Sequence, residues 1–151
     1  MEHSKKALDY FHEGYNCAQA VAMAFCDVTG LSQTQAARMA SAFGGGIGRM
    51  REVCGAVSGM YMVLGILYGY DEPGKQADKK NLYTHVQELA AEFKAQSGSI
   101  ICRDILKNPA SDPNPTPRSP EFYAMRPCDR MVFEAARLMD EFIAAHPLEN
   151  T

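Results

Sequence analysis

Apolar residues recur at three- and four-residue spacing along most of the chain, and no convincing run alternates apolar and polar residues as a strand would. This pattern predicts an all-α fold, a bundle or array of six to seven helices. Glycine and proline residues mark the breaks between the helices. The expected helices cover residues 4–13, 17–28, 32–43, 53–70, 75–96, a short segment around 101–106, and the segment after Pro127.

Two of these helices begin with recognisable capping residues. Asn16 precedes the helix at 17–28, which Gly30 ends. Ser32 and Gln35 fit a capping box, in which each side chain bonds to the other residue's backbone N–H.

The helix at 53–70 carries small residues four positions apart on one face. Gly55 and Gly59 form one pair, and Gly65 and Gly69 form another. Because glycine costs roughly 0.5–1 kcal/mol relative to alanine inside a helix, we expect neighbouring helices to approach closely here.

The segment Asn108–Pro127 holds six of the eight prolines, which excludes a regular helix. It predicts an irregular excursion over the surface, a lid or a strap.

Composition and charge narrow the class of protein. A chain of 151 residues with 46% apolar residues predicts a single domain over 1–151. The net charge is −3 and the basic residues are scattered, so neither nucleic acid nor a membrane surface is expected as a partner. The charged N-terminus does not resemble an export signal, and the apolar run from Gly55 to Tyr70 is shorter than the roughly 20 residues that span a bilayer, so we expect a cytoplasmic protein.

The chemistry of the chain lies in its five cysteines. Four of them fall in the first turn of an expected helix, where backbone N–H groups and the helix dipole favour a thiolate: Cys17, Cys54, Cys102 and Cys128. Cys26 lies late in an apolar helix and is interpreted as a core residue. No C-x-x-C pair occurs, so spacing alone leaves inert core thiols, metal ligands and redox groups all open.

A resemblance to a known family favours the redox and metal interpretations. The segment from Cys54 to Gly59 reads CGAVSG, a CGAxxG motif, with Cys17 before it and Cys102 and Cys128 after it. Together with Gly14–Val21, Phe43–Gly46 and Gly98–Ser99, it resembles the redox-active C_GCAxxG_C_C family, whose name prints the first two motif letters in another order. The resemblance implies a bacterial or archaeal domain whose four cysteines do redox work, and it supplies no substrate.

Three functions therefore compete. The first is thiol–disulfide exchange or electron transfer by Cys17, Cys54, Cys102 and Cys128, with a redox partner protein or a small thiol or oxidant; whether this makes the protein an oxidoreductase enzyme is open. Cys54 is the expected nucleophile, with a depressed pKa, because a glycine-rich turn and the basic residues Arg49 and Arg51 precede it. The second is a metal-binding protein whose same four cysteines ligate an iron–sulfur cluster or zinc. The third is a helical interaction module with inert thiols, and a homo-oligomer is compatible with all three.

Geometry separates these functions. Four similar helix-start placements predict that the four cysteines converge, in one cluster or in two nearby pairs. The turn Gly44–Arg49 also resembles a phosphate-binding loop, but the lysine that such loops require is missing, so we interpret it as a tight turn beneath Cys54.

Overall fold

The structure is a computed structural model that describes residues 3–107 and 110–148. Within these ranges it contains nine α-helices, one 3-10 turn and no strand, which confirms the all-α fold and exceeds the six to seven helices expected. In chain order the elements are α1 (His3–His12), α2 (Cys17–Ala24), α3 (Cys26–Thr29), α4 (Gln33–Ala40), the 3-10 turn η1 (Ser41–Phe43), α5 (Gly55–Tyr68), α6 (Gln76–Ser97), α7 (Cys102–Leu106), α8 (Pro120–Met125) and α9 (Cys128–Ala145). None of the helices described is long and apolar enough to cross a membrane.

One of the additional helices arises from a break at Phe25, inside the helix expected at 17–28. Phe25 leaves helical geometry at φ −102° and ψ 13°, and α3 begins at the next residue. Its side chain is fully buried and stacks on the His3 ring, with ring centroids 4.2 Å apart. Burial of this ring is favoured over continuing the helix, so the prediction of one unbroken helix was wrong.

The His3 ring also ties the N-terminus to distant parts of the fold. Its Nδ1 lies 2.6 Å from Oδ1 of Asp140 on α9, and its Nε2 lies 2.9 Å from Oδ1 of Asp27 on α3. These two contacts of one ring join α1 to α3 and to α9.

Both capping residues predicted from the sequence are confirmed. Ser32 and Gln35 form the expected capping box at the start of α4. Asn16 caps α2, and Gln19 completes a second capping box that the sequence analysis did not identify.

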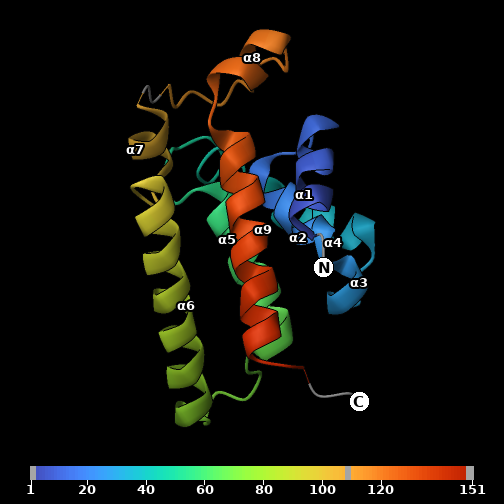
Figure 1. Cartoon of the computed structure of the whole chain (residues 1–151), viewed down its shortest axis with the longest axis vertical. Coiled ribbons are helices and arrows are strands. Elements are labelled where there is room, and N and C mark those ends of the chain that lie inside the picture. The colour runs from blue at the N-terminus through green and yellow to red at the C-terminus, as the bar shows by residue number, and fades with distance from the viewer. Residues whose placement is uncertain (1–2, 108–109, 149–151) are drawn as a thin grey trace.

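The core lies where α5 and α9 meet α1 and α2. Figure 1 shows α9 at the centre, α5 behind it, α6 along one side and α1 and α2 on the other. The buried apolar residues of the main core come from these helices: Ala7, Phe11, Ala20, Val21, Ala24, Ala56, Val57, Met60, Val63, Leu64, Leu89, Phe93, Val132, Ala135, Ala136, Leu138, Met139 and Phe142.

Close helix approach occurs at one of the two predicted glycine pairs. A Cβ added at Gly59 would lie 2.7 Å from the Ala18 carbonyl oxygen, so only glycine lets α5 lie this near α2. A Cβ added at Gly65 would meet nothing within 4 Å. The prediction of close packing therefore holds for Gly55 and Gly59 and was wrong for Gly65.

The proline-rich segment crosses one end of the molecule as a strap, but it is not wholly irregular. Ser119 caps a short helix, α8, with Pro120 at its first turn, and this corrects the prediction of an irregular course over Asn108–Pro127. Residues 108 and 109 lie outside the described residues. Arg118 fixes the strap, because its guanidinium donates to the carbonyl oxygens of Phe11 and Tyr15 at 3.1 and 2.9 Å.

Candidate redox site

The glycine-rich segment before Cys54 forms a left-handed turn. Five consecutive residues, 45–49, have φ between 55° and 70°, and two of them, Ile47 and Arg49, are not glycine. Arg51 is left-handed as well, at φ 63°. Left-handed geometry costs a non-glycine residue roughly 1–2 kcal/mol, so the fold accepts backbone strain to place these arginines.

The backbone next to this turn brings Cys102 to Cys54. Segment 52–54 pairs antiparallel with 100–102: the Cys54 N–H donates to the Ile100 carbonyl at 2.7 Å, and the Cys102 N–H donates to the Glu52 carbonyl at 2.7 Å. The turn itself presses on Cys102, since a Cβ added at Gly46 would lie 2.7 Å from the Cys102 Cβ. This isolated bridge carried no signal in the helical periodicity of the sequence.

Gly55 brings the second pair of cysteines close to the first. A Cβ added there would lie 3.2 Å from the Cys17 Cβ and 3.0 Å from the Phe43 carbonyl oxygen. Cys17 in turn shares a thiol–thiol hydrogen bond with Cys128, at the start of α9. The N-terminal ends of α2, α5 and α9 therefore meet at one place.

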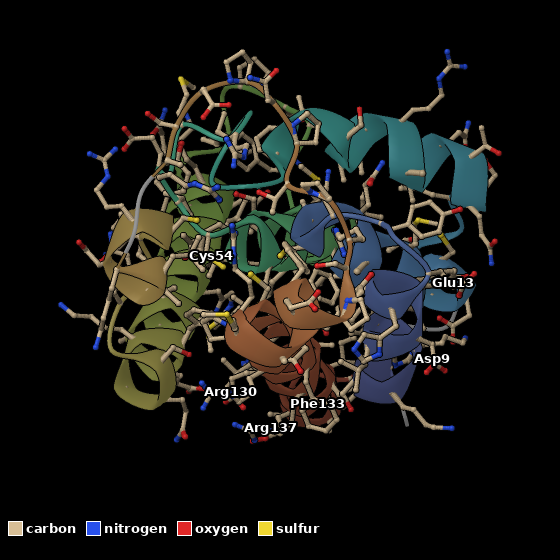
Figure 2. All side chains as sticks on the ribbon, turned by 90° about the horizontal axis from the view of Figure 1, so that it is seen from above. Asp9, Glu13, Cys54, Arg130, Phe133 and Arg137 are labelled. Carbon is tan, nitrogen blue, oxygen red and sulfur yellow. The ribbon has the colours of Figure 1, made fainter. Side chains whose placement is uncertain are left out.

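All four cysteines line one cavity of about 300 Å³, as their predicted convergence requires. Figure 2 looks onto the α8 end of the molecule and shows Cys54 in the interior, while Arg130, Phe133 and Arg137 lie at the outer edge. Pro113, Pro115 and Thr116 of the strap also line the cavity. The fifth cysteine, Cys26, does not line this cavity, as expected for a residue outside the four-cysteine pattern.

The structure corrects the expectation that Cys54 is the activated thiol. Cys54 is the N-cap residue of α5 and is only 6% exposed, and burial raises its pKa to about 12 although the Ala56 and Val57 N–H groups counteract this. The arginines that were expected to activate it bind elsewhere. Arg49 donates to the strap at Asp112 and Thr116, and Arg51 donates to Ala110 and to the sulfur of Cys102. Desolvation therefore outweighs the helix N-terminus.

Cys128 is the thiol whose pKa is lowered, to about 7. The main cause is the hydrogen bond from Cys17, and the guanidinium groups of Arg126, Arg118 and Arg51 add to it. The same hydrogen bond, together with burial, raises the pKa of Cys17 well above its ordinary value. The pair is thus a thiolate at Cys128 supported by a thiol at Cys17, and both residues are partly exposed.

The environment of Cys102 is intermediate between those of Cys54 and Cys128, because it combines burial with a nearby guanidinium. It is 8% exposed, and burial raises its pKa, although the Arg51 guanidinium, whose Nη1 lies 3.8 Å from its sulfur, opposes the rise. Burial and the nearby Asp27 carboxylate also raise the pKa of Cys26, and Lys6 opposes the rise.

The alternative of a metal centre lacks a preformed ligand set. Within residues 3–107 and 110–148, no group of three or more His, Cys, Asp or Glu side chains is arranged to hold a metal ion. The four sulfurs share a cavity, and the interaction between Cys17 and Cys128 shifts the pKa values of both.

The chain matches the family model described as "Putative redox-active protein (C_GCAxxG_C_C)" over residues 15–142. The match covers most of the chain, so the protein belongs to the C_GCAxxG_C_C family. No curated protein and no solved structure matches the chain.

The sequence analysis missed two residues of the site, Arg118 and Arg126. Both line the cavity and come from the strap and its end. Arginines beside prolines in an irregular segment carry no positional signal, although Arg126 lies two residues before Cys128 and sequence proximity could have suggested it.

Proposed function

We propose that this protein is a thiol–disulfide oxidoreductase in which Cys128 is the attacking thiol and Cys17 the resolving thiol. The observation that carries the proposal is the hydrogen-bonded Cys17–Cys128 pair at the cavity, with a pKa of about 7 at Cys128. A thiol with a pKa near the ambient pH combines a large thiolate fraction with good nucleophilicity.

The exchange proceeds in two displacements. The Cys128 thiolate attacks one sulfur of a substrate disulfide, forms a mixed disulfide and releases the other half of the substrate as a thiolate. Cys17 then loses its proton and attacks the Cys128 sulfur, which forms a Cys17–Cys128 disulfide and releases the second half. Two electrons pass from the protein pair to the substrate. The proton from Cys17 goes to one released thiolate and solvent protonates the other, so the substrate leaves as two thiols.

Cys54 and Cys102 have a supporting role in this proposal. Both are buried, and their high pKa values keep them protonated near neutral pH. They line the same cavity as the reacting pair.

Alkylation tests the proposal. The reduced protein is treated with iodoacetamide from about pH 5 to about pH 10, and the modification of each cysteine is measured by peptide mass spectrometry. We expect a midpoint near 7 for Cys128 and almost no modification of Cys54 in the folded protein. A Cys128 midpoint at or above the free-cysteine value of about 8.5 would contradict the proposal.

Disulfide mapping gives a second, independent readout. After oxidation with one equivalent of diamide and blocking of the remaining thiols, we expect a Cys17–Cys128 disulfide. The C128S variant should lose it, while C26S, which removes a cysteine outside the cavity, should keep it. A disulfide that instead joins Cys54 to another cysteine would assign the chemistry to the other pair.

A further inference from the structure

The cavity is cationic in a chain whose net charge is −3. Four arginines line it, and no aspartate, glutamate, lysine or histidine of the described residues does so. The four are Arg49, Arg51, Arg118 and Arg126. The charge of the cavity is therefore opposite in sign to that of the protein as a whole.

Most of this charge has no carboxylate partner. Arg49 pairs with Asp112, whose carboxylate oxygen lies 3.2 Å from Nη1. For Arg51, Arg118 and Arg126, no carboxylate lies within ion-pair distance among residues 3–107 and 110–148. Three guanidinium groups thus surround the reacting thiols with positive charge that the protein itself does not neutralise.

Of the three, Arg51 gives the strongest indication of an anionic ligand, because it is only 3% exposed. Burying a charge that has no counter-charge is unfavourable in free energy, and an anion bound in the functional state offsets this cost. Its neighbours are the Ala110 carbonyl oxygen, 2.9 Å from Nε, and the Cys102 sulfur. The cavity is therefore built for negative charge, and the Cys128 thiolate accounts for one unit of it.

Arg126 is the arginine best placed to take a ligand. The one hydrogen bond described for its side chain is from Nη2 to the Thr116 hydroxyl, at 3.3 Å, and the guanidinium also lies over the Phe122 ring. Arg118, by contrast, donates to two carbonyl groups and a tyrosine hydroxyl and lies over the Phe11 ring. A guanidinium with free N–H groups matches a carboxylate in a two-point contact.

We infer that the cavity selects a small disulfide that carries carboxylates, with Arg126 holding a carboxylate while Cys128 attacks the disulfide. This inference rests on the proposed function and specifies its substrate class. A volume of about 300 Å³ suits a low-molecular-weight ligand rather than a protein segment. The exchange is the one described above, and it turns each dicarboxylate disulfide into two carboxylate thiols while Cys17 and Cys128 are oxidised.

Three disulfides of similar size and different charge test the inference: 3,3′-dithiodipropionate, which is dianionic, bis(2-hydroxyethyl) disulfide, which is neutral, and cystamine, which is dicationic. The rate of Cys17–Cys128 disulfide formation is measured with each by quenching and mass spectrometry. Each rate is divided by the rate of the same disulfide with 2-mercaptoethanol, which removes intrinsic differences in reactivity. We expect the normalised rate for the anionic disulfide to exceed that for the cationic one by about tenfold or more, and the ratio to fall as salt is added.

Variants locate the effect. R126Q should lower the ratio severalfold and R126K should retain most of it, while R130Q should leave it unchanged, because Arg130 is exposed on α9 and outside the cavity. The ratio is independent of the thiolate fraction of Cys128, so a change in its pKa in R126Q does not disturb the readout. Equal normalised rates for all three disulfides, or a ratio that R126Q does not change, would overturn the inference and leave the proposed function standing. Failure of Cys128 to react with any of the three would overturn both.

Discussion

The two halves of the cysteine cluster have opposite properties although all four residues lie at helix starts. Cys54 and Cys102 are buried and are fixed by paired backbone, whereas Cys17 and Cys128 are partly exposed. The pKa is about 12 at Cys54 and about 7 at Cys128. Both residues lie at the start of a helix, so the difference comes from burial, from the neighbouring thiol and from the arginines.

The comparison shows that a helix N-terminus does not by itself activate a cysteine. At Cys54, loss of solvation raises the pKa more than the two backbone N–H groups lower it. At Cys128, a hydrogen bond from Cys17 and positive charge from Arg126 outweigh the cost of burial. Three predictions separate the buried pair from the reactive pair.

The largest effect is expected from crowding the turn that covers the buried pair. In G46A, the new Cβ would meet the Cys102 Cβ and the Glu52 nitrogen, each at 2.7 Å, in a backbone with φ +70°. Overpacking and left-handed strain together should lower the free energy of unfolding by about 2–5 kcal/mol. The matched control is G48A, which has a similar φ of +55° but open space, and should lose only about 1–2 kcal/mol.

Urea unfolding of the two reduced variants measures this difference. Cys102 should also become more reactive to alkylation in G46A, while Cys128 changes little. Equal losses of stability in the two variants would mean that the turn does not press on Cys102.

A smaller effect should appear in the stability of the reduced protein at alkaline pH. The folded pKa of Cys54 is raised, so the stability it contributes is complete below the unfolded value of about 8.5 and is lost as the pH rises through about 12. Cys128 has the opposite sign: its folded pKa is lowered, so its contribution is present above about 8.5 and is lost as the pH falls through about 7.

The variants C54S and C128S separate the contributions of the two cysteines to stability. From pH about 8.5 upward, C54S should lose stability less steeply than the parent, and between about 7 and 8.5 the rise in stability should be absent from C128S. Denaturant unfolding at each pH gives the two profiles. Identical profiles for C54S and C128S would refute the contrast between the pairs.

The smallest effect concerns the hydrogen bond within the reactive pair. C17A removes the donor, so the alkylation midpoint of Cys128 should rise from about 7 toward the ordinary value of about 8.5. C17S keeps a hydroxyl donor and should stay closer to the parent. If C17A leaves the midpoint at about 7, the arginines rather than Cys17 determine it.

Much of the architecture could be predicted from local pattern. The helical periods of α1, α5, α6 and α9 and the caps at Asn16 and Ser32 depend on residues near one another in the chain. The spacing of Gly55 and Gly59 is also local and indicated a close approach, although the helix that approaches, α2, lies far away in the chain. The break at Phe25 could not be predicted, because Phe25 stacks on the ring of His3, which belongs to a different helix. Helix α8 was missed because a high proline count hid a capped turn beginning at Ser119.

The sequence by itself also determined which four cysteines belong together, since their helix-start positions and the CGAVSG motif are local features. Only the tertiary structure decided which of them is a thiolate. A thiol's pKa depends on the solvent it loses and on the charges that surround it, and these come from segments far apart in the chain: Cys17 beside Cys128, and Arg51 and Arg126 around the same cavity. Burial of Cys54 in the main core reversed the assignment of the nucleophile, because desolvation acts through three-dimensional packing that no spacing of residues records.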